Sequence, residues 1–206
     1  MKKYLVFDLD GTLVVSNSQI DSIIYNYLEK NLNSESIETA RYYIENFQWM
    51  SLQELFNNLI EDKTQAKFHR DKLTEEIDAL QNQVQFFDQA CELVEKLSKE
   101  YTLFLSTGNS DNFAEDILKK WNIYQYFEKI LGSTNIMKST QHLEEFYKHI
   151  QDENFYENAT FIWDGTRDRE IAESKGLNFI HIGNDGTDQY EISEIKYIET
   201  ILPLIK

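Results

Sequence analysis

The sequence predicts an α/β protein with a Rossmann-like parallel sheet and an inserted α-helical segment. Short β-rich runs alternate with segments whose apolar residues recur at helical spacing, and this alternation is typical of crossover units in a parallel sheet. The interval 14–85 interrupts the alternation, because its apolar residues form helical clusters and it contains no glycine or proline. We therefore expect a core domain of residues 1–13 and 86–206 and a helical domain of residues 14–85.

Five short runs are expected to be the strands of the sheet. The first begins at Tyr4 and is apolar throughout, as is typical of a strand buried on both faces of a parallel sheet. The other four are rich in β-branched, aromatic and aliphatic residues. They occupy residues 102–105, 129–131, 160–163 and 179–182.

Helices are expected between these strands, because apolar residues there recur at intervals of three and four. Ser110 precedes the second repeat and is a suitable N-cap, since its hydroxyl can accept a hydrogen bond from the first turn. Gly176 is expected to end a helix that starts near Asp168. The three repeats begin at Ala90, Phe113 and Leu143.

The net charge limits the choice of partners. The chain has 20 basic and 36 acidic residues, a formal charge of −16. A field of that sign repels nucleic acid and anionic membranes, so neither is expected as a partner. A small anionic substrate remains possible, because a bound cation and local lysines set the potential inside a cleft.

The sequence gives few signs of export. Cys91 is the only cysteine, so no intramolecular disulfide can form, which fits a reducing compartment. The apolar run after Lys2 and Lys3 is interrupted at Asp8, too early for a signal peptide. No uncharged apolar stretch approaches the roughly 20 residues that span a bilayer. We expect a cytoplasmic protein, either a monomer or a homodimer.

Two carboxylates follow the first strand directly and define a candidate site. Asp8 and Asp10 are separated by one residue, so they share a face if strand geometry continues through the turn at Gly11. Two like charges so close repel each other unless a cation or a proton lies between them. The end of the first strand is therefore a candidate Mg²⁺ site and a candidate place for acid–base chemistry.

Polar residues follow three further strands as well. Ligands of parallel sheets bind beyond the carboxyl ends of the strands, so loops at this edge converge on one site. The polar residues concerned are Ser106 and Thr107 after the second strand, Lys138 after the third, and Asp164 and Asp168 after the fourth. The histidines show no metal-ligand spacing and are expected on the surface or in satisfied core positions. They are His69, His142, His149 and His181.

These residues form four ordered motifs: Asp8-Leu9-Asp10-Gly11-Thr12, Ser106-Thr107, Lys138 and Asp164-Gly165-Thr166-Arg167-Asp168. In order and spacing they resemble the four motifs of the haloacid dehalogenase-like (HAD) hydrolase superfamily. The insertion after the first motif resembles that superfamily's helical C1-type cap. The resemblance implies a HAD core and a Mg²⁺-dependent phosphomonoester hydrolase, a phosphatase, that acts on a small phosphorylated metabolite through an aspartyl-phosphate intermediate.

The chemistry of the first and fourth motifs agrees with these implied roles. Asp8 would be the nucleophile, because a carboxylate can attack phosphorus when a cation screens the repulsion. Asp10 would protonate the leaving oxygen and then deprotonate water. Mg²⁺ prefers oxygen ligands and would take them from Asp8, Asp164 and the backbone carbonyl of Asp10.

The second and third motifs would contact the phosphoryl group. A hydroxyl of Ser106 or Thr107 would bind a phosphoryl oxygen beside Gly108, with a slight preference for Ser106; both hydroxyls could equally be helix caps. Lys138 would offset negative charge on the nucleophile and the transferred group. Asp168 would hold a metal-bound water or Lys138.

Several alternatives remain open at this point. A phosphomutase uses the same two aspartates and differs mainly in excluding water, and a noncatalytic member could bind a partner protein through its acidic cap. Dehalogenating relatives typically lack the second aspartate, so Asp10 argues against that activity. Val15 and Trp163 depart from the residues common in the family and weaken analogies about substrate.

The insertion itself allows two interpretations. Its apolar residues could be the core of the insertion and its basic residues a solvated face, or the insertion could close over the strand edge and select small substrates. The residues concerned are Trp49, Leu52, Leu55, Phe56 and Leu59, followed by Lys63, Lys67, Arg70 and Lys72.

Overall fold

The computed structural model describes residues 3–15, 17–46, 51–79, 84–183, 186 and 188–205. The chain forms two compact units, one of residues Met1–Val15 with Val84–Lys206 and the other of residues Ser16–Gln83. Along the described part of the chain, no helix combines the length and the apolar character needed to cross a membrane.

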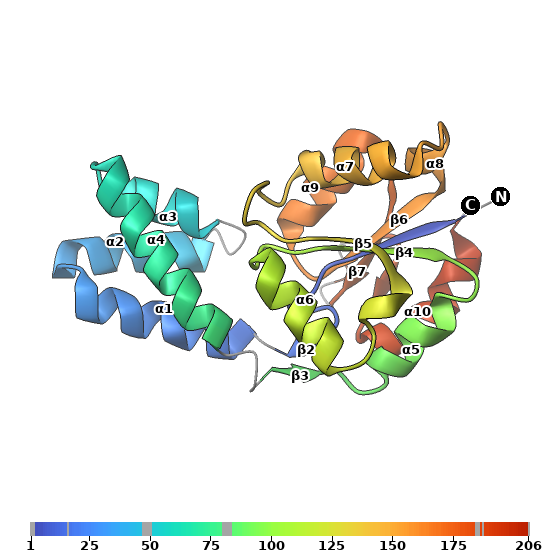
Figure 1. The fold of residues 1–206 in the computed structure, drawn as a ribbon, viewed down its shortest axis with the longest axis horizontal. Coiled ribbons are helices and arrows are strands. Elements are labelled where there is room, and N and C mark those ends of the chain that lie inside the picture. The colour runs from blue at the N-terminus through green and yellow to red at the C-terminus, as the bar shows by residue number, and fades with distance from the viewer. Residues whose placement is uncertain are drawn as a thin grey trace. The chain divides into compact units, whose positions relative to one another are not determined.

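The first unit contains a six-stranded parallel sheet with strand order β5-β4-β1-β6-β7-β8 (Figure 1). All five expected strands are confirmed, and the two-residue strand β8 is an addition that its length kept from being recognised in the sequence. The strands are β1 (Tyr4–Phe7), β4 (Thr102–Ser106), β5 (Phe127–Leu131), β6 (Ala159–Trp163), β7 (Asn178–Ile182) and β8 (Glu191–Ile192).

Strand β1 lies inside the sheet, paired with β4 on one side and β6 on the other. Tyr4 is in register with Thr102 and with Ala159, although they are far away in the sequence. Every residue of β1 is at most 1% exposed. This burial on both faces explains why the strand is apolar throughout and does not alternate.

Helices cover both faces of the sheet (Figure 1). One face carries α7, α8 and α9, and the other carries α5, α6 and α10. Short 3₁₀ turns η2, η3 and η4 follow α6, β8 and α10. The bounds are α5 (Ala90–Leu97), α6 (Asp111–Lys120), η2 (Tyr124–Tyr126), α7 (Thr140–Ile150), α8 (Phe155–Asn158), α9 (Thr166–Lys175), η3 (Ile195–Tyr197), α10 (Ile198–Ile201) and η4 (Leu202–Leu204).

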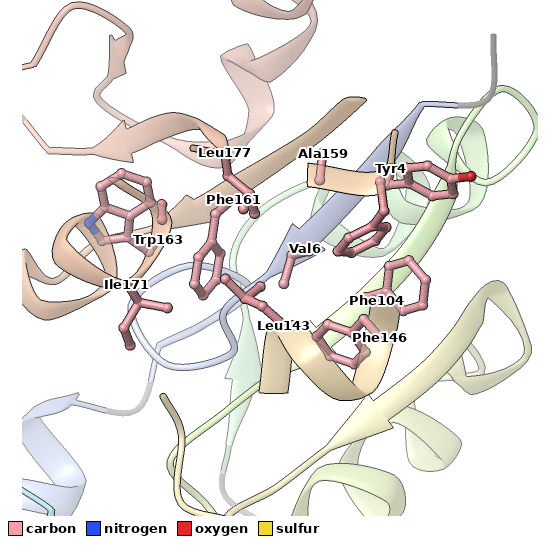
Figure 2. Close-up of a cluster of buried hydrophobic side chains, with 12 residues drawn as sticks. Tyr4, Val6, Phe104, Leu143, Phe146, Ala159, Phe161, Trp163, Ile171 and Leu177 are labelled. Carbon is pink, nitrogen blue, oxygen red and sulfur yellow. The ribbon is translucent and has the colours of Figure 1, made fainter. Parts of the chain in front are cut away.

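The face under α7 to α9 is packed with aromatic side chains, as Figure 2 shows. Tyr4 and Val6 of β1 point into this cluster, where the Phe104 and Phe146 rings lie 4.6 Å apart between centroids. Alternate residues of a strand share a face, so Asp8, two residues after Val6, emerges on this same side of the sheet. Asp8 is therefore expected on the face of the sheet that α7, α8 and α9 cover.

Both expected helix ends are confirmed. The Ser110 hydroxyl accepts a hydrogen bond from the Phe113 backbone nitrogen at 3.1 Å and caps α6. Gly176 follows α9 with φ of +72°, the left-handed conformation that a residue with a Cβ rarely adopts.

The second unit is helical, and strands β2 (Val14–Val15) and β3 (Gln85–Phe86) pair antiparallel in the first unit where the chain leaves and returns. The buried core of the helical unit includes Leu55 and Phe56, and Leu52 and Leu59 pack against it. Trp49 lies outside the described residues. Its helices are α1 (Asn17–Asn31), α2 (Ser34–Asn46), α3 (Leu52–Leu59) and α4 (Lys63–Asp78).

The loops after β4 and β5 are hydrogen-bonded to each other. The Ser133 nitrogen donates to the Asn109 carbonyl at 2.6 Å, and its hydroxyl donates to the Thr107 carbonyl at 3.0 Å. The same hydroxyl accepts from the Lys138 nitrogen at 3.0 Å. At Gly132 the two backbones are so close that a Cβ would lie 2.5 Å from the Asp111 nitrogen.

We predict that Gly132→Ala destabilises the protein, because the added methyl group meets backbone atoms that cannot rotate away. The free energy of unfolding should fall by about 1–3 kcal/mol, the usual cost of such overpacking. Urea denaturation measures this change. Gly108→Ala is the matched control, since a Cβ there meets nothing within 4 Å. Equal stability of the two variants would contradict the prediction.

Candidate active site

Asp8 occupies the first position after β1 and is 6% exposed. Its backbone nitrogen donates to the Ile162 carbonyl at 2.9 Å, so the adjoining strand β6 holds it in place. Its Oδ1 accepts from the Leu9 nitrogen at 2.7 Å. Three residues after Asp8, Gly11 adopts φ of +68° and its nitrogen donates to the Val14 carbonyl, which makes a tight turn directly after Asp10.

Lys138 joins two carboxylates at this end of the sheet. Its Nζ lies 2.9 Å from Oδ1 of Asp8 and 2.7 Å from Oδ2 of Asp168 on α9. The same nitrogen lies 5.9 Å from the centroid of the Phe161 ring. All three charged side chains are largely shielded from water. Counting side-chain atoms alone, the exposed fraction is 16% for Lys138, 9% for Asp8 and 7% for Asp168. Removing one partner from such a group costs about 3–5 kcal/mol.

The electrostatic balance around Asp8 remains negative despite Lys138. Desolvation raises the pKa of the Asp8 carboxyl, and the Lys138 ammonium opposes that rise. The carboxylates of Asp168, Asp164 and Asp10 raise the pKa of Asp8 further. Desolvation lowers the pKa of Lys138, but Asp168 and Asp8 outweigh it and the net shift is upward. Lys138 therefore stays charged, whereas the surroundings of Asp8 disfavour a negative charge on that carboxyl.

The chemistry of these side chains fits a divalent cation. Asp8 and Asp164 follow neighbouring strands, and the oxygen atoms of carboxylates and of backbone carbonyls such as that of Asp10 are the ligands that Mg²⁺ prefers. Among the described residues, no group of three or more acidic, histidine or cysteine side chains is arranged to hold a metal. Mg²⁺ usually binds only one or two carboxylates and completes its shell with water and phosphate. The ligand set of Asp8, Asp164 and the Asp10 carbonyl stays a prediction.

Thr107 and Asn109 lie beside Asp10. The Asn109 amide nitrogen donates to Oδ2 of Asp10 and lies 3.3 Å from Oγ1 of Thr107. The Asn109 backbone nitrogen donates to the same Thr107 oxygen at 3.2 Å. Gly108 between them is exposed and leaves room above the backbone. The loop after β4 therefore meets the loop after β1 at Asp10.

Ser106 makes a different set of contacts. Its hydroxyl lies 2.9 Å from Nδ1 of the fully buried His142, whose Nε2 lies 3.0 Å from the Ile136 carbonyl. A carbonyl only accepts, so Nε2 carries the proton and Nδ1 accepts from the Ser106 hydroxyl. Desolvation lowers the pKa of His142, which keeps the ring neutral. These contacts favour Thr107 over Ser106 as the hydroxyl that faces a ligand, contrary to the slight preference drawn from the sequence.

Sequence reasoning missed Asn109 and gave His142 only a general position. Asn109 lies three residues after the end of β4, and proximity to that strand end was the only available signal. His142 is four residues after Lys138, but its role depends on the packing of α7 against β4, which helical periodicity does not reveal. The structure brings Asp8, Lys138 and Asp168 into direct contact and places Asp164 close enough to Asp8 to raise its pKa.

Comparison with known proteins agrees with this architecture. The chain matches the model of the haloacid dehalogenase-like hydrolase family over residues 5–182. No curated protein matches it. A haloacid dehalogenase-like hydrolase from Streptococcus pneumoniae has a TM-score of 0.74 at 22% identity, with 98% of each chain covered. A predicted phosphoglycolate phosphatase from Haemophilus somnus has a TM-score of 0.72 at 19% identity, also with 98% of each chain covered.

A third structure, a HAD hydrolase from Bacillus subtilis bound to magnesium, has a TM-score of 0.71 at 16% identity, with 98% of this chain and 99% of that chain covered. At these identities the structures show a shared fold. The family model spans most of the chain and includes all four motifs. The chain belongs to the haloacid dehalogenase-like hydrolase family.

Proposed function

We propose that this hydrolase is a Mg²⁺-dependent phosphatase that acts on a small phosphorylated metabolite. The observation that carries the proposal is the buried contact of Asp8 with Lys138, in a group of carboxylates whose charge raises the pKa of Asp8. Such a group suits a reaction at a phosphoryl centre, where a cation and an ammonium neutralise developing charge. The phosphatase names among the structural neighbours point in the same direction.

In the first step Asp8 attacks the phosphorus atom. A bond forms between an Asp8 carboxylate oxygen and phosphorus, and the bond from phosphorus to the ester oxygen breaks. Asp10 gives its proton to that leaving oxygen, so the alcohol departs neutral. The Thr107 hydroxyl donates to a phosphoryl oxygen, and Lys138 stabilises the negative charge on the transferred group.

In the second step water attacks the aspartyl-phosphate. Asp10, now a carboxylate, takes a proton from the water as the new oxygen–phosphorus bond forms. The bond between Asp8 and phosphorus breaks, which releases inorganic phosphate and restores both carboxyl groups. Bound Mg²⁺ supplies charge neutralisation for the phosphoryl oxygens and for Asp8.

We further propose that the helical unit Ser16–Gln83, which lies within the predicted insertion 14–85, is a cap that restricts access to small substrates. Its basic residues on α4 mostly have acidic partners within the same helix. Lys67 and Arg70 contact Asp71 at 3.9 and 2.7 Å, and Lys72 contacts Glu75 at 2.7 Å. The exposed Lys67 and Lys72 pairs favour a solvated face for these residues, so they do not support the cap proposal. The cap would restrict access by excluding water and not through these basic residues.

Phosphatase activity against p-nitrophenyl phosphate should require Mg²⁺. Excess EDTA should abolish the release of p-nitrophenol, and added Mg²⁺ should restore it, because the carboxylates repel the phosphate dianion without a cation. A steady-state assay of the purified chain measures this requirement. Full turnover in excess EDTA would contradict the metal role. Transfer of phosphate to a sugar phosphate in place of water would support the alternative of a phosphomutase.

Asp8→Asn should lower kcat by roughly 10³-fold or more, since a neutral amide is a poor nucleophile and a poor metal ligand. Thermal unfolding of the variant checks that it stays folded, because asparagine keeps the shape of the side chain but loses the ion pair with Lys138. Asp88→Asn is the control, an exposed aspartate just before α5 in the same unit, and it should leave kcat unchanged. An Asp8→Asn variant as active as the parent would refute the covalent mechanism.

Asp10→Asn should lower kcat/KM by about 10²-fold or more for an alkyl phosphate, which has a poor leaving group. The loss should be smaller for p-nitrophenyl phosphate, because p-nitrophenolate leaves without a proton. Comparing kcat/KM for the two substrates measures the difference. Equal losses for both would show that Asp10 does not protonate the leaving oxygen.

A further inference from the structure

Asn109 has an unusual set of contacts for a loop residue. Its side-chain nitrogen donates to the carboxylate of Asp10 and to the hydroxyl of Thr107, two groups from different loops. Its own backbone is fixed from both directions, because its nitrogen donates to Thr107 and its carbonyl accepts from Ser133. The NH₂ side of the amide is the one that faces Asp10.

This arrangement orients both neighbours. Asp10 lies at the start of a tight turn and outside a regular strand, so its position depends on contacts such as that with Asn109. Thr107 Oγ1 accepts from both the backbone and the side-chain nitrogen of Asn109. Its hydroxyl hydrogen therefore points away from Asn109.

We propose that Asn109 is a positioning residue for the reaction. It holds the Asp10 carboxyl group in place for proton transfer to the leaving oxygen. This inference rests on the proposed phosphatase function and assigns a role to a residue outside the four motifs. Asn109 does not exchange a proton or touch the phosphorus atom; it acts through Asp10.

The proposal has a kinetic signature that a structural role lacks. Proton donation by Asp10 matters most for substrates with poor leaving groups, so misplacing Asp10 should harm those substrates selectively. The constant kcat/KM includes the steps up to phosphoryl transfer and excludes hydrolysis of the aspartyl-phosphate. The leaving-group dependence of kcat/KM thus isolates the step in which Asp10 acts as an acid.

The test is Asn109→Ala, assayed with Mg²⁺ against an alkyl phosphate and p-nitrophenyl phosphate. We expect kcat/KM to fall by about tenfold to hundredfold for the alkyl phosphate and by less than about threefold for p-nitrophenyl phosphate. Asn112→Ala, an exposed asparagine on the first turn of α6, is the matched control and should change neither constant. Thermal unfolding of both variants checks that the loop change leaves the fold intact.

A double variant strengthens the test. If Asn109 acts through Asp10, then Asn109→Ala in an Asp10→Asn background should add no further leaving-group dependence. An equal loss for both substrates in the single variant, or an additive effect in the double variant, would overturn the proposal. Failure of the proposed function is distinguishable, because the parent protein would then hydrolyse neither substrate.

Discussion

The candidate site depends on the ammonium group of Lys138, which lies between two largely buried carboxylates. Without it, Asp8 and Asp168 would face each other and the neighbouring acids without the ammonium group that contacts both of them. Burial makes this compensation strong, because water screens the charges poorly at this depth. The compensation is nevertheless incomplete, because three carboxylates still raise the pKa of Asp8. A folded protein tolerates this imbalance, and a cation would relieve it.

Lys138 can neutralise Asp8 and Asp168 only if the loop that carries it is held against the rest of the sheet. Three kinds of contact do this. Ser133 bonds the loop to the one after β4, Gly132 lets the two backbones approach, and His142 bridges Ser106 to the Ile136 carbonyl two residues before Lys138. The groups that hold this loop in place are therefore small or neutral.

The sequence allowed the main architecture to be predicted, because β1 and its neighbours are short, buried and bounded by polar residues. The pairing of Lys138 with Asp168 was also anticipated as one of two possibilities, and the structure shows that contact. The direction in which an individual side chain points could not be predicted from the sequence. Ser106 and Thr107 are adjacent hydroxyl residues at a strand end, and only the position of His142 separates them. Asn109 was missed because its partners, Asp10 and Thr107, belong to loops that meet only in the folded sheet.

The place of β1 in the sheet affects how the chain can fold. Both strands that pair with it, β4 and β6, lie far downstream, beyond the entire helical unit. During synthesis β1 is made first, but it has no partner in the sheet until residues 102–106 have emerged. The buried side chains of the helical unit contact one another over a shorter stretch of chain and involve less loop closure. Between the synthesis of β1 and that of β4 this apolar strand therefore stays unpaired in the sheet, which exposes it to aggregation or chaperone binding.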